Sequence, residues 1–291
     1  MVTPNQIERI VRAALDEDAP WGDLTSEYFI PASATARAAL VAREPGVFSG
    51  GGVFAAAFRL TDPSIDVRAH VADGTAFTTG DVLASVSGPA RAVLTAERVG
   101  LNLVQRMSGV ATLTSRYVAE VGHTGARIAD TRKTTPGLRT LERQAVRDGG
   151  GHNHRYSLSD AVMLKDNHLA VLAATRTGSL TDILRASIAR LPHTTHVEVE
   201  VDRLDQIPAV LAAGVGTIML DNFSLADLRT GVAEIAGRAV VEASGGVSLE
   251  TVRAIAETGV DVISVGALTH SARALDLGLD VDLDLTAADR P

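Results

Sequence analysis

Two lysines stand out among the basic residues of the chain. Of 27 lysines and arginines, only Lys133 and Lys165 are lysines, and each follows an apolar run that predicts a β-strand. Lysine presents a compact, mobile charge, whereas arginine presents a rigid planar fork. Functional side chains gather at strand ends, because the strand is rigid and the following loop can reach a ligand. We therefore interpret both lysines as site residues; a compositional bias that spared two lysines is the alternative.

The first lysine belongs to a basic loop. Residues 131–137 (TRKTTPG) follow the apolar stretch 126–129 and Asp130. Arg132 and Lys133 thus place two adjacent positive charges where a strand gives way to a loop. Such a pair favours an anionic ligand, either a carboxylate or a phosphate.

The second unusual stretch is 149–155 (GGGHNHR), in which three glycines give close access to the backbone. His152 and His154 could be metal ligands, or the loop could bind an anion through histidine and arginine. We favour the anion, because four basic side chains are expected nearby and would repel a dication unless local carboxylates outweigh them. These four side chains are Arg132, Lys133, Arg155 and Lys165.

Later strand ends carry acidic residues and glycines. Glu200 and Asp221 are suited to Mg²⁺ or to sugar hydroxyls. Residues 244–246 (SGG) and 264–267 (SVGA) follow two consecutive apolar runs, and we expect a helix to begin near Ser248. Glycine amides and a helix N-terminus both favour phosphate. Simple tight turns are the alternative interpretation of these glycines.

The elements that carry these residues alternate in type. Apolar runs recur from residue 126 onward, with helix-like segments between them, and most runs lack the alternation of a half-exposed strand. This pattern is typical of parallel strands that are buried on both faces, so we predict an α/β fold. In a βα barrel all the strand ends above meet at one rim, which holds the active site. An open doubly wound sheet is the second choice, without a Gly-x-Gly-x-x-Gly motif to support it.

The first part of the chain has another pattern. Thr3, Pro4 and Gln6 predict the start of a helix, and the stretches 35–42, 47–54, 65–71 and 82–86 predict mainly antiparallel strands of an α+β domain. From about residue 94 the pattern is helical again. On this evidence alone Arg98 is a solvated helix charge.

Composition restricts the kind of protein. The net charge of −8 argues against a general nucleic-acid binder, and the absence of cysteine excludes disulfides and thiolate chemistry. We find no signal peptide in the acidic N-terminus and no apolar run that could cross a bilayer, so we expect a cytoplasmic protein. Clusters of positive charge in such a chain suggest an anionic small molecule.

Seven motifs in order resemble those of the quinolinate phosphoribosyltransferases, the decarboxylating nicotinate-nucleotide pyrophosphorylases of NAD biosynthesis. They occupy residues 97–102 (ERVGLN), 131–137 (TRKTTPG), 150–155 (GGHNHR), 164–168 (LKDNH), 198–201 (EVEV), 220–222 (LDN) and 243–246 (ASGG). The resemblance implies a nicotinate-nucleotide diphosphorylase (carboxylating), a pentosyltransferase that uses Mg²⁺. Its substrates would be phosphoribosyl pyrophosphate and quinolinate, and its products nicotinate mononucleotide, pyrophosphate and CO₂.

The same resemblance implies an N-terminal α+β domain at residues 1–112, an incomplete α/β barrel at 113–270, and a tail at 271–291 that returns to the first domain. It also implies a homodimer, in which the N-terminal domain of one subunit closes the barrel site of the other. The resemblance does not say whether such dimers assemble into larger oligomers.

Roles follow residue by residue from the resemblance. Arg132, His154, Arg155 and Lys165 would hold the two quinolinate carboxylates, with Arg98 joining from the partner subunit, which replaces the solvated-helix interpretation of Arg98. Lys133 would meet the pyrophosphate. Glu200 and Asp221 would hold ribose hydroxyls and Mg²⁺, and together with both lysines they form the expected catalytic set. The 5-phosphate would bind Ser244, Gly245, Gly246, Ser264 and Gly266.

One departure and three alternatives accompany the resemblance. Relatives often have Glu-Lys-Tyr and then a cysteine where this chain has Glu142-Arg143-Gln144 and Asp148. We expect this difference to affect the packing of the loop and not the chemistry of the site. A nicotinate-type or molybdenum-associated relative would share the fold but not the substrate. A Schiff-base lyase would use Lys165. A non-catalytic anion-binding protein would bind without turnover.

Overall fold

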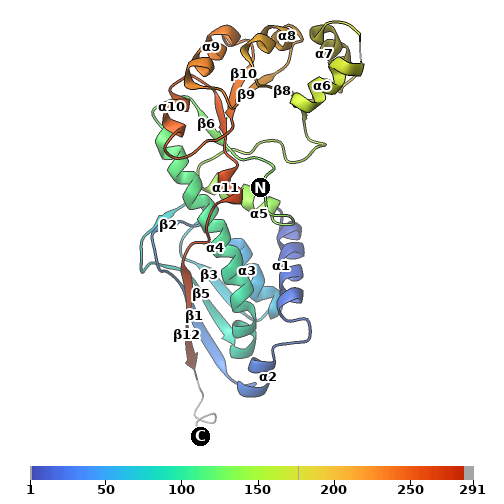
Figure 1. The fold of residues 1–291 in the computed structure, drawn as a ribbon. Coiled ribbons are helices and arrows are strands. Elements are labelled where there is room, and N and C mark those ends of the chain that lie inside the picture. The colour runs from blue at the N-terminus through green and yellow to red at the C-terminus, as the bar shows by residue number, and fades with distance from the viewer. Residues whose placement is uncertain (1, 176, 285–291) are drawn as a thin grey trace. The chain divides into compact units, whose positions relative to one another are not determined.

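The computed structural model describes residues 2–175 and 177–284, which fall into two compact units (Figure 1). The first unit comprises residues 1–115, 134–150 and 268–291, and the second comprises 116–133 and 151–267, in both cases as far as these residues are described. The domain bounds expected from the sequence, 1–112, 113–270 and 271–291, stay a prediction. No helix of the described residues is long and apolar enough to span a membrane.

The first unit contains an antiparallel sheet in the order β12-β1-β5-β3. Its strands are β1 (Thr35–Ala42), β3 (Asp66–Ala69), β5 (Val82–Pro89) and β12 (Leu277–Asp284). Along β1 the side chains alternate between buried and more exposed positions, as in a sheet covered on one face. Two short strands, β2 (Gly46–Val47) and β4 (Ala76–Phe77), form a separate pair. The predicted antiparallel α+β character of this part of the chain is confirmed.

The first unit also contains helices, several of which lie beside the four-stranded sheet (Figure 1). They are α1 (Pro4–Asp18), α2 (Leu24–Phe29), α3 (Gly51–Thr61), α4 (Ala90–Val121, of which residues 116–121 belong to the second unit) and α5 (Arg139–Asp148). The capping box of Thr3 and Gln6 starts α1 as predicted.

The strand predicted at residues 47–54 is wrong beyond Val47, because α3 begins at Gly51. The carboxylate of Asp73 accepts hydrogen bonds from the amides of Gly50 and Gly51, at 3.0 Å each, and so caps the helix from another segment. Gly50 has a φ of 104°, which suits glycine. The helix then buries Val53, Phe54, Ala57 and Phe58, which lie on one helical face. An apolar run of this length does not distinguish a strand from a buried helix.

The second unit is built on a six-stranded parallel sheet in the order β6-β11-β10-β9-β8-β7. The strands are β6 (Arg127–Ala129), β7 (Val162–Leu164), β8 (Val197–Val201), β9 (Thr217–Asp221), β10 (Val240–Ser244) and β11 (Val262–Ser264). Between and after them lie α6 (Asp166–Thr175), α7 (Leu180–Ile188), the 3₁₀ helix η1 (Leu204–Gln206), α8 (Ile207–Ala212), α9 (Leu225–Ile235), α10 (Val252–Ala256) and α11 (Ala267–His270, of which residues 268–270 belong to the first unit).

This sheet confirms the α/β prediction and does not close into a full barrel. Within residues 2–175 and 177–284, the edge strands β6 and β7 do not pair with each other. A single parallel bridge between Ala129 and His152 extends the β6 edge. The carboxyl ends of the parallel strands nevertheless share one edge of the sheet, as the sequence pattern predicted.

Side-chain alternation sorts the residues of this sheet between two faces. Val199, Ile218, Leu220 and Ile263 are completely buried on one face. Their neighbours Glu200, Met219 and Asp221 point to the other face, since successive side chains of a strand alternate. The packing of the apolar face fixes the register of the strands. This register in turn sets the positions of the polar side chains on the other face.

Candidate active site

A cavity of about 590 Å³ opens on the polar face of the second unit, at the carboxyl ends of the strands. Its lining is Thr131, Arg132, Lys133, His154, Arg155, Met163, Lys165, Glu200, Met219, Asp221, Asn222, Ser244, Gly245, Gly246 and Ser264. The structure therefore brings together eleven of the thirteen predicted site residues. The other two, Arg98 and Gly266, are not in this lining.

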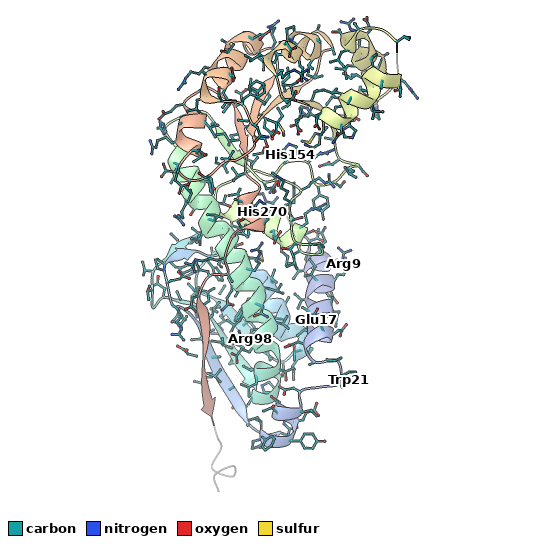
Figure 2. The ribbon with its side chains drawn as sticks, in the orientation of Figure 1. Arg9, Glu17, Trp21, Arg98, His154 and His270 are labelled. Carbon is teal, nitrogen blue, oxygen red and sulfur yellow. The ribbon has the colours of Figure 1, made fainter. Side chains whose placement is uncertain are left out.

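Arg98 lies on α4 in the first unit, where its side chain is 57% exposed (Figure 2). Its guanidinium is 3.8 Å from the carboxylate of Glu97, a distance typical of a weak surface ion pair. Gly266 follows β11 by two residues and precedes α11. His152 is exposed and takes part in the bridge to Ala129 through its backbone, so it does not join His154 in the cavity wall.

Basic side chains form one wall of the cavity. Arg132 and Lys133 come from the loop after β6, Arg155 from the loop before β7, and Lys165 from the end of β7. Arg155 donates a hydrogen bond to the carbonyl oxygen of Ala161 at 2.8 Å. Burial and the neighbouring charge of Arg132 lower the pKa of Arg155, which indicates that an anion between the two guanidinium groups would be favourable.

Acidic side chains at the ends of two adjacent strands form the second part of the cavity, and one of them contacts the basic wall. The carboxylate of Glu200 forms an ion pair with the ammonium group of Lys165. Glu200 is the more buried of the two side chains. Asp221 accepts a hydrogen bond of 2.6 Å from the side-chain amide of Asn222. Two carboxylates at neighbouring strand ends offer the hard oxygen ligands that Mg²⁺ prefers, so these residues fit the expected ion.

A glycine loop forms the third part of the cavity. Gly245 and Gly246 have φ angles of 92° and 58°, in the left-handed region. A Cβ atom on Gly245 would lie 2.2 Å from Oδ1 of Asn222, so no other residue fits without a shift. The helix expected to begin near Ser248 starts later: the carbonyl oxygen of Ser248 accepts hydrogen bonds from the amides of Thr251 and Val252, but α10 begins only at Val252 and is five residues long. The backbone amides of the glycine loop are the groups that would bind a phosphate here.

His154, labelled in Figure 2, lines the cavity and contacts two buried carboxylates. Its Nε2 atom is 3.1 Å from Oε2 of Glu198 and 3.5 Å from Oε1 of Glu242. Burial alone would lower the pKa of His154, but the two carboxylates outweigh it and raise the pKa to about 10. Burial raises the pKa of Glu198, against the hydrogen bond from His154, which lowers it.

The other ring nitrogen of His154 is also engaged, since the backbone amide of Arg155 donates to Nδ1 at 2.7 Å. This contact requires an unprotonated Nδ1, whereas the raised pKa favours a ring with both nitrogens protonated. Both observations are consistent with a proton on Nε2. We therefore assign an Nε2–H group that donates a hydrogen bond to Glu198. The three residues could in principle hold a cation, but Nε2 is already hydrogen-bonded.

Several residues of the site were not predicted as such. Asn222, Thr131, Met163 and Met219 line the cavity, and Asp130, Glu198 and Glu242 support it from below. Asp130 is completely buried, and its carboxylate accepts hydrogen bonds from the backbone amide of His154 at 2.7 Å and the side chain of Asn153 at 2.6 Å. The signal for Glu198 was available, because it stands two positions before Glu200 on the same face of β8.

Known proteins resemble the chain over nearly its whole length. The family model for the quinolinate phosphoribosyl transferase N-terminal domain matches residues 23–108, and the model for the C-terminal domain matches residues 110–280. A nicotinate-nucleotide pyrophosphorylase [carboxylating] of Mycobacterium leprae is 45% identical over 280 residues, which are 93% of this chain and 95% of that protein.

Two further relatives agree with these matches. A probable nicotinate-nucleotide pyrophosphorylase [carboxylating] of Bacillus subtilis is 40% identical over 278 residues, which are 96% of this chain and 94% of the relative. The crystal structure of NadC from Streptococcus pyogenes superposes with a TM-score of 0.92 at 40% identity, covering 98% of each chain. The chain therefore belongs to the quinolinate phosphoribosyltransferase family, the pentosyltransferases of NAD biosynthesis.

Proposed function

We propose that the chain transfers the phosphoribosyl group of phosphoribosyl pyrophosphate to quinolinate and releases nicotinate mononucleotide, pyrophosphate and CO₂. The observation that carries this proposal is that one cavity combines a basic wall, an acidic pair and a glycine loop. These three parts match a substrate with two carboxylates, a ribose with its hydroxyls, and a phosphate.

The basic wall is assigned to the pyridine substrate and the pyrophosphate. Arg132, Arg155 and Lys165 bind the quinolinate carboxylates, with His154 at the floor of the same wall. Lys133 binds the phosphates that leave. Each charge-assisted hydrogen bond to a carboxylate contributes about 1.5–3 kcal/mol, so two carboxylates justify several cations in one small cavity.

The acidic pair and the glycine loop are assigned to the ribose and its 5-phosphate. Glu200 and Asp221 bind ribose hydroxyls and would hold Mg²⁺, partly through the substrate. When bound, the ion supplies charge neutralisation for the leaving pyrophosphate. The 5-phosphate binds the backbone amides of Gly245 and Gly246, with Ser244, Ser264 and Gly266 beside them.

The chemistry needs positioning and electrostatics rather than a protein nucleophile. The bond from ribose C1 to the pyrophosphate oxygen breaks, and the oxygen keeps the electron pair. The lone pair of the pyridine nitrogen forms the new bond to C1, while the carboxylates of Glu200 and Asp221 stabilise the positive charge that develops there. The bond from ring C2 to its carboxylate then breaks, CO₂ leaves, and the electron pair stays at C2 beside the positively charged nitrogen until C2 takes up a proton.

The ion pair between Lys165 and Glu200 argues against the Schiff-base alternative. A lysine that attacks a carbonyl must be a neutral amine, and enzymes obtain it by placing the amine in an apolar pocket or beside another cation. Lys165 instead contacts the carboxylate of Glu200, which is neither an apolar pocket nor a neighbouring cation. The contact suits a lysine that binds anions.

A homodimer is part of the proposal, and two features of the first unit support it. Arg98 is exposed on α4, available to a site on a second copy. The same unit carries four exposed large apolar side chains within nine residues, Trp21 (labelled in Figure 2), Leu24, Tyr28 and Phe29, each at least 68% exposed. Exposed apolar groups gathered in one short segment are typical of a surface that another protein covers. A cytoplasmic location stays a prediction.

The test is an activity assay with phosphoribosyl pyrophosphate, Mg²⁺ and quinolinate, with nicotinate in a parallel reaction. The proposal predicts nicotinate mononucleotide and CO₂ from quinolinate alone, and loss of product after chelation of Mg²⁺. Turnover of nicotinate instead would contradict the two-carboxylate assignment of the basic wall. Binding of quinolinate without turnover would favour the anion-binding protein, and borohydride trapping of Lys165 with a carbonyl substrate would favour the lyase.

A further inference from the structure

Two buried glutamates beneath the cavity have no role in the reaction proposed above. Glu198 on β8 and Glu242 on β10 are each 3% exposed. Oε1 of Glu198, Oε1 of Glu242 and Oγ of Ser264 accept no hydrogen bond from the part of the chain that the structure describes. Carboxylates are rarely buried so completely unless a specific partner requires them.

The strand register places both glutamates directly below the site. Glu198 precedes Glu200 by two residues and Glu242 precedes Ser244 by two, so each shares a face with a cavity residue and lies one interior position further from the rim. In the sheet, Met219 pairs with Glu200 on one side and Glu242 on the other. The two carboxylates thus reach the same interior space from strands that flank β9.

Their shared contact is the imidazole of His154, which is held on every polar side. Nε2 faces both glutamates, at 3.1 and 3.5 Å, and Nδ1 accepts the hydrogen bond from the amide of Arg155. The backbone amide of His154 itself donates to Asp130. Because His154 lines the cavity, the two glutamates fix the position of a side chain of the site itself.

Stability does not explain this arrangement. A buried ion pair is often no more stabilising than apolar side chains of the same volume, and two carboxylates around one imidazole leave an excess of negative charge. The strands around the cluster are rich in valine, isoleucine and leucine, so an apolar floor is the simpler solution. Glutamates at these positions instead indicate a requirement for a fixed orientation of the ring.

We propose that Glu198 and Glu242 are positioning residues that hold the imidazole of His154 in the wall of the cavity. His154 is thereby fixed next to Arg155, so that the two side chains together bind a carboxylate of the pyridine substrate. The inference rests on the proposed function, since it concerns the affinity of that substrate.

The test compares Glu198→Ala, Glu198→Gln and Glu242→Ala with the wild-type protein, by calorimetric titration of quinolinate and separately of phosphoribosyl pyrophosphate with Mg²⁺, and by steady-state kinetics. Glutamine keeps the volume and one acceptor oxygen for Nε2–H. We expect the alanine variants to lose about tenfold or more in quinolinate affinity, Glu198→Gln to recover most of that loss, and the affinity for phosphoribosyl pyrophosphate to stay unchanged.

The matched control is Glu257→Gln. Glu257 also pairs with a histidine of the same unit, His123 at 3.1 Å, but this pair is about half exposed and should leave both affinities unchanged. In a His154→Ala background, Glu198→Ala should have no further effect on quinolinate affinity, because the glutamate acts through the histidine.

Three results would overturn the inference: unchanged quinolinate affinity in Glu198→Ala, an equal fall in both affinities, or a glutamine variant as weak as the alanine variant. An additive effect in the His154→Ala background would overturn it as well. A wild-type protein that does not turn over quinolinate would contradict the proposed function itself, before any variant is compared.

Discussion

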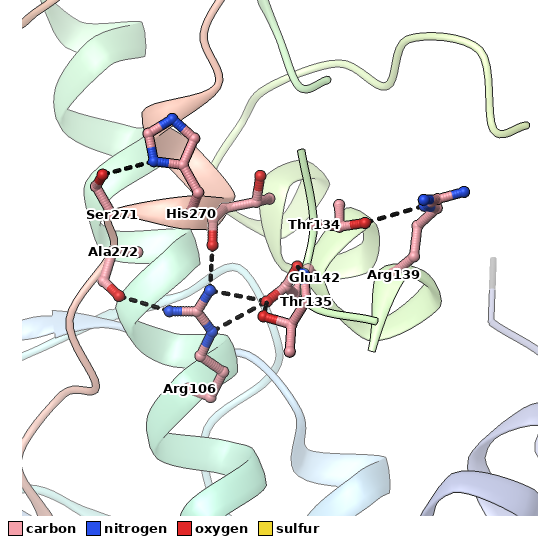
Figure 3. A network of polar contacts seen from close by, with 9 residues as sticks. Arg106, Thr134, Thr135, Arg139, Glu142, His270, Ser271 and Ala272 are labelled. Carbon is pink, nitrogen blue, oxygen red and sulfur yellow. Dashed lines mark hydrogen bonds and ion pairs between the residues drawn. The ribbon is translucent and has the colours of Figure 1, made fainter. Parts of the chain in front are cut away.

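The guanidinium group of Arg106 on α4 donates from Nη2 to Oε1 of Glu142 on α5 at 2.8 Å, and Glu142 is completely buried (Figure 3). The same guanidinium donates to the carbonyl oxygens of Thr269 and Ala272, and Glu142 also accepts from the amide of Thr135 at 3.0 Å. One ion pair thus joins three segments of the first unit that are far apart in sequence.

Removal of one member of this pair should be strongly destabilising. Arg106→Met leaves the charge of Glu142 buried without its cation, and we expect a loss of about 3–5 kcal/mol in the free energy of unfolding. Guanidinium denaturation would measure it. The control is Arg253→Met, which removes the exposed pair with Glu120 and should cost about 0–1 kcal/mol. Similar losses of unfolding free energy in both variants would show that the buried pair of Arg106 and Glu142 stabilises the fold no more than an exposed pair does.

The glycine loop leads to a prediction about phosphoribosyl pyrophosphate. Gly245→Ala adds a Cβ atom 2.2 Å from Oδ1 of Asn222, which must displace the loop. We expect the affinity for phosphoribosyl pyrophosphate to fall by roughly tenfold to a hundredfold, as measured by calorimetry. Gly214→Ala is the matched control, because Gly214 has a similar φ of 83° with nothing near its Cβ position. A normal affinity in Gly245→Ala would mean that the loop does not bind the phosphate.

The assignment of Arg98 to the partner's site can be tested by mixing two inactive proteins. Arg98→Ala and Lys133→Ala should each be inactive alone. In a mixed dimer, one site receives Arg98 and Lys133 from different subunits and is intact, while the other lacks both. After random subunit exchange, activity should return to about one quarter of the wild-type value. No recovery, in a mixture shown to contain mixed dimers, would place Arg98 in the site of its own subunit or outside any site.

The partly buried Asp148 provides a pH-dependent prediction. Burial raises the pKa of Asp148, against a hydrogen bond of 2.6 Å from Ser49, and the charge of Asp73 raises it further. A carboxyl group with a raised pKa in the folded state contributes stability below its unfolded pKa, near 3.9, and that contribution is lost as pH rises through the folded value.

Asp148→Asn should therefore raise the free energy of unfolding at pH 7, and this gain should shrink as the pH falls toward the unfolded pKa. Urea denaturation at pH 7 and at about pH 4 would measure it. Asp18→Asn, at an exposed position, is the control and should show no such difference. A loss of stability at pH 7 in Asp148→Asn would mean that the hydrogen bonds of the carboxylate outweigh its desolvation.

The sequence predicted the parts of the site that depend on strand ends. Lys165, Glu200, Asp221 and Ser244 stand directly at or after apolar runs, and the parallel arrangement brings such ends to one edge whatever their separation in sequence. The prediction failed where periodicity is ambiguous. Residues 47–54 form an apolar run that fits either a strand or a buried helix, and the cap of α3 comes from Asp73, which is distant in sequence.

Other features lay beyond sequence reasoning for a different reason. Glu198 and Glu242 occupy strand interiors, and nothing in either strand alone shows that the two carboxylates meet at one imidazole from strands on either side of β9. The short α10 is a similar case, because the turn at residues 248–251 delays the helix that its apolar residues predict. Contacts between distant segments determine both outcomes.

The pairing of β1 with β12 runs through all eight residues of each strand, from Thr35 with Asp284 to Ala42 with Leu277. A sheet that contains residues 35–42 is therefore completed by residues that follow the whole second unit in sequence. During translation β1 exposes one edge while the whole second unit emerges from the ribosome, and such unpaired edges are prone to aggregation. The first unit can complete its sheet only after the second unit has been made, so the first unit cannot finish folding before the second unit is synthesised.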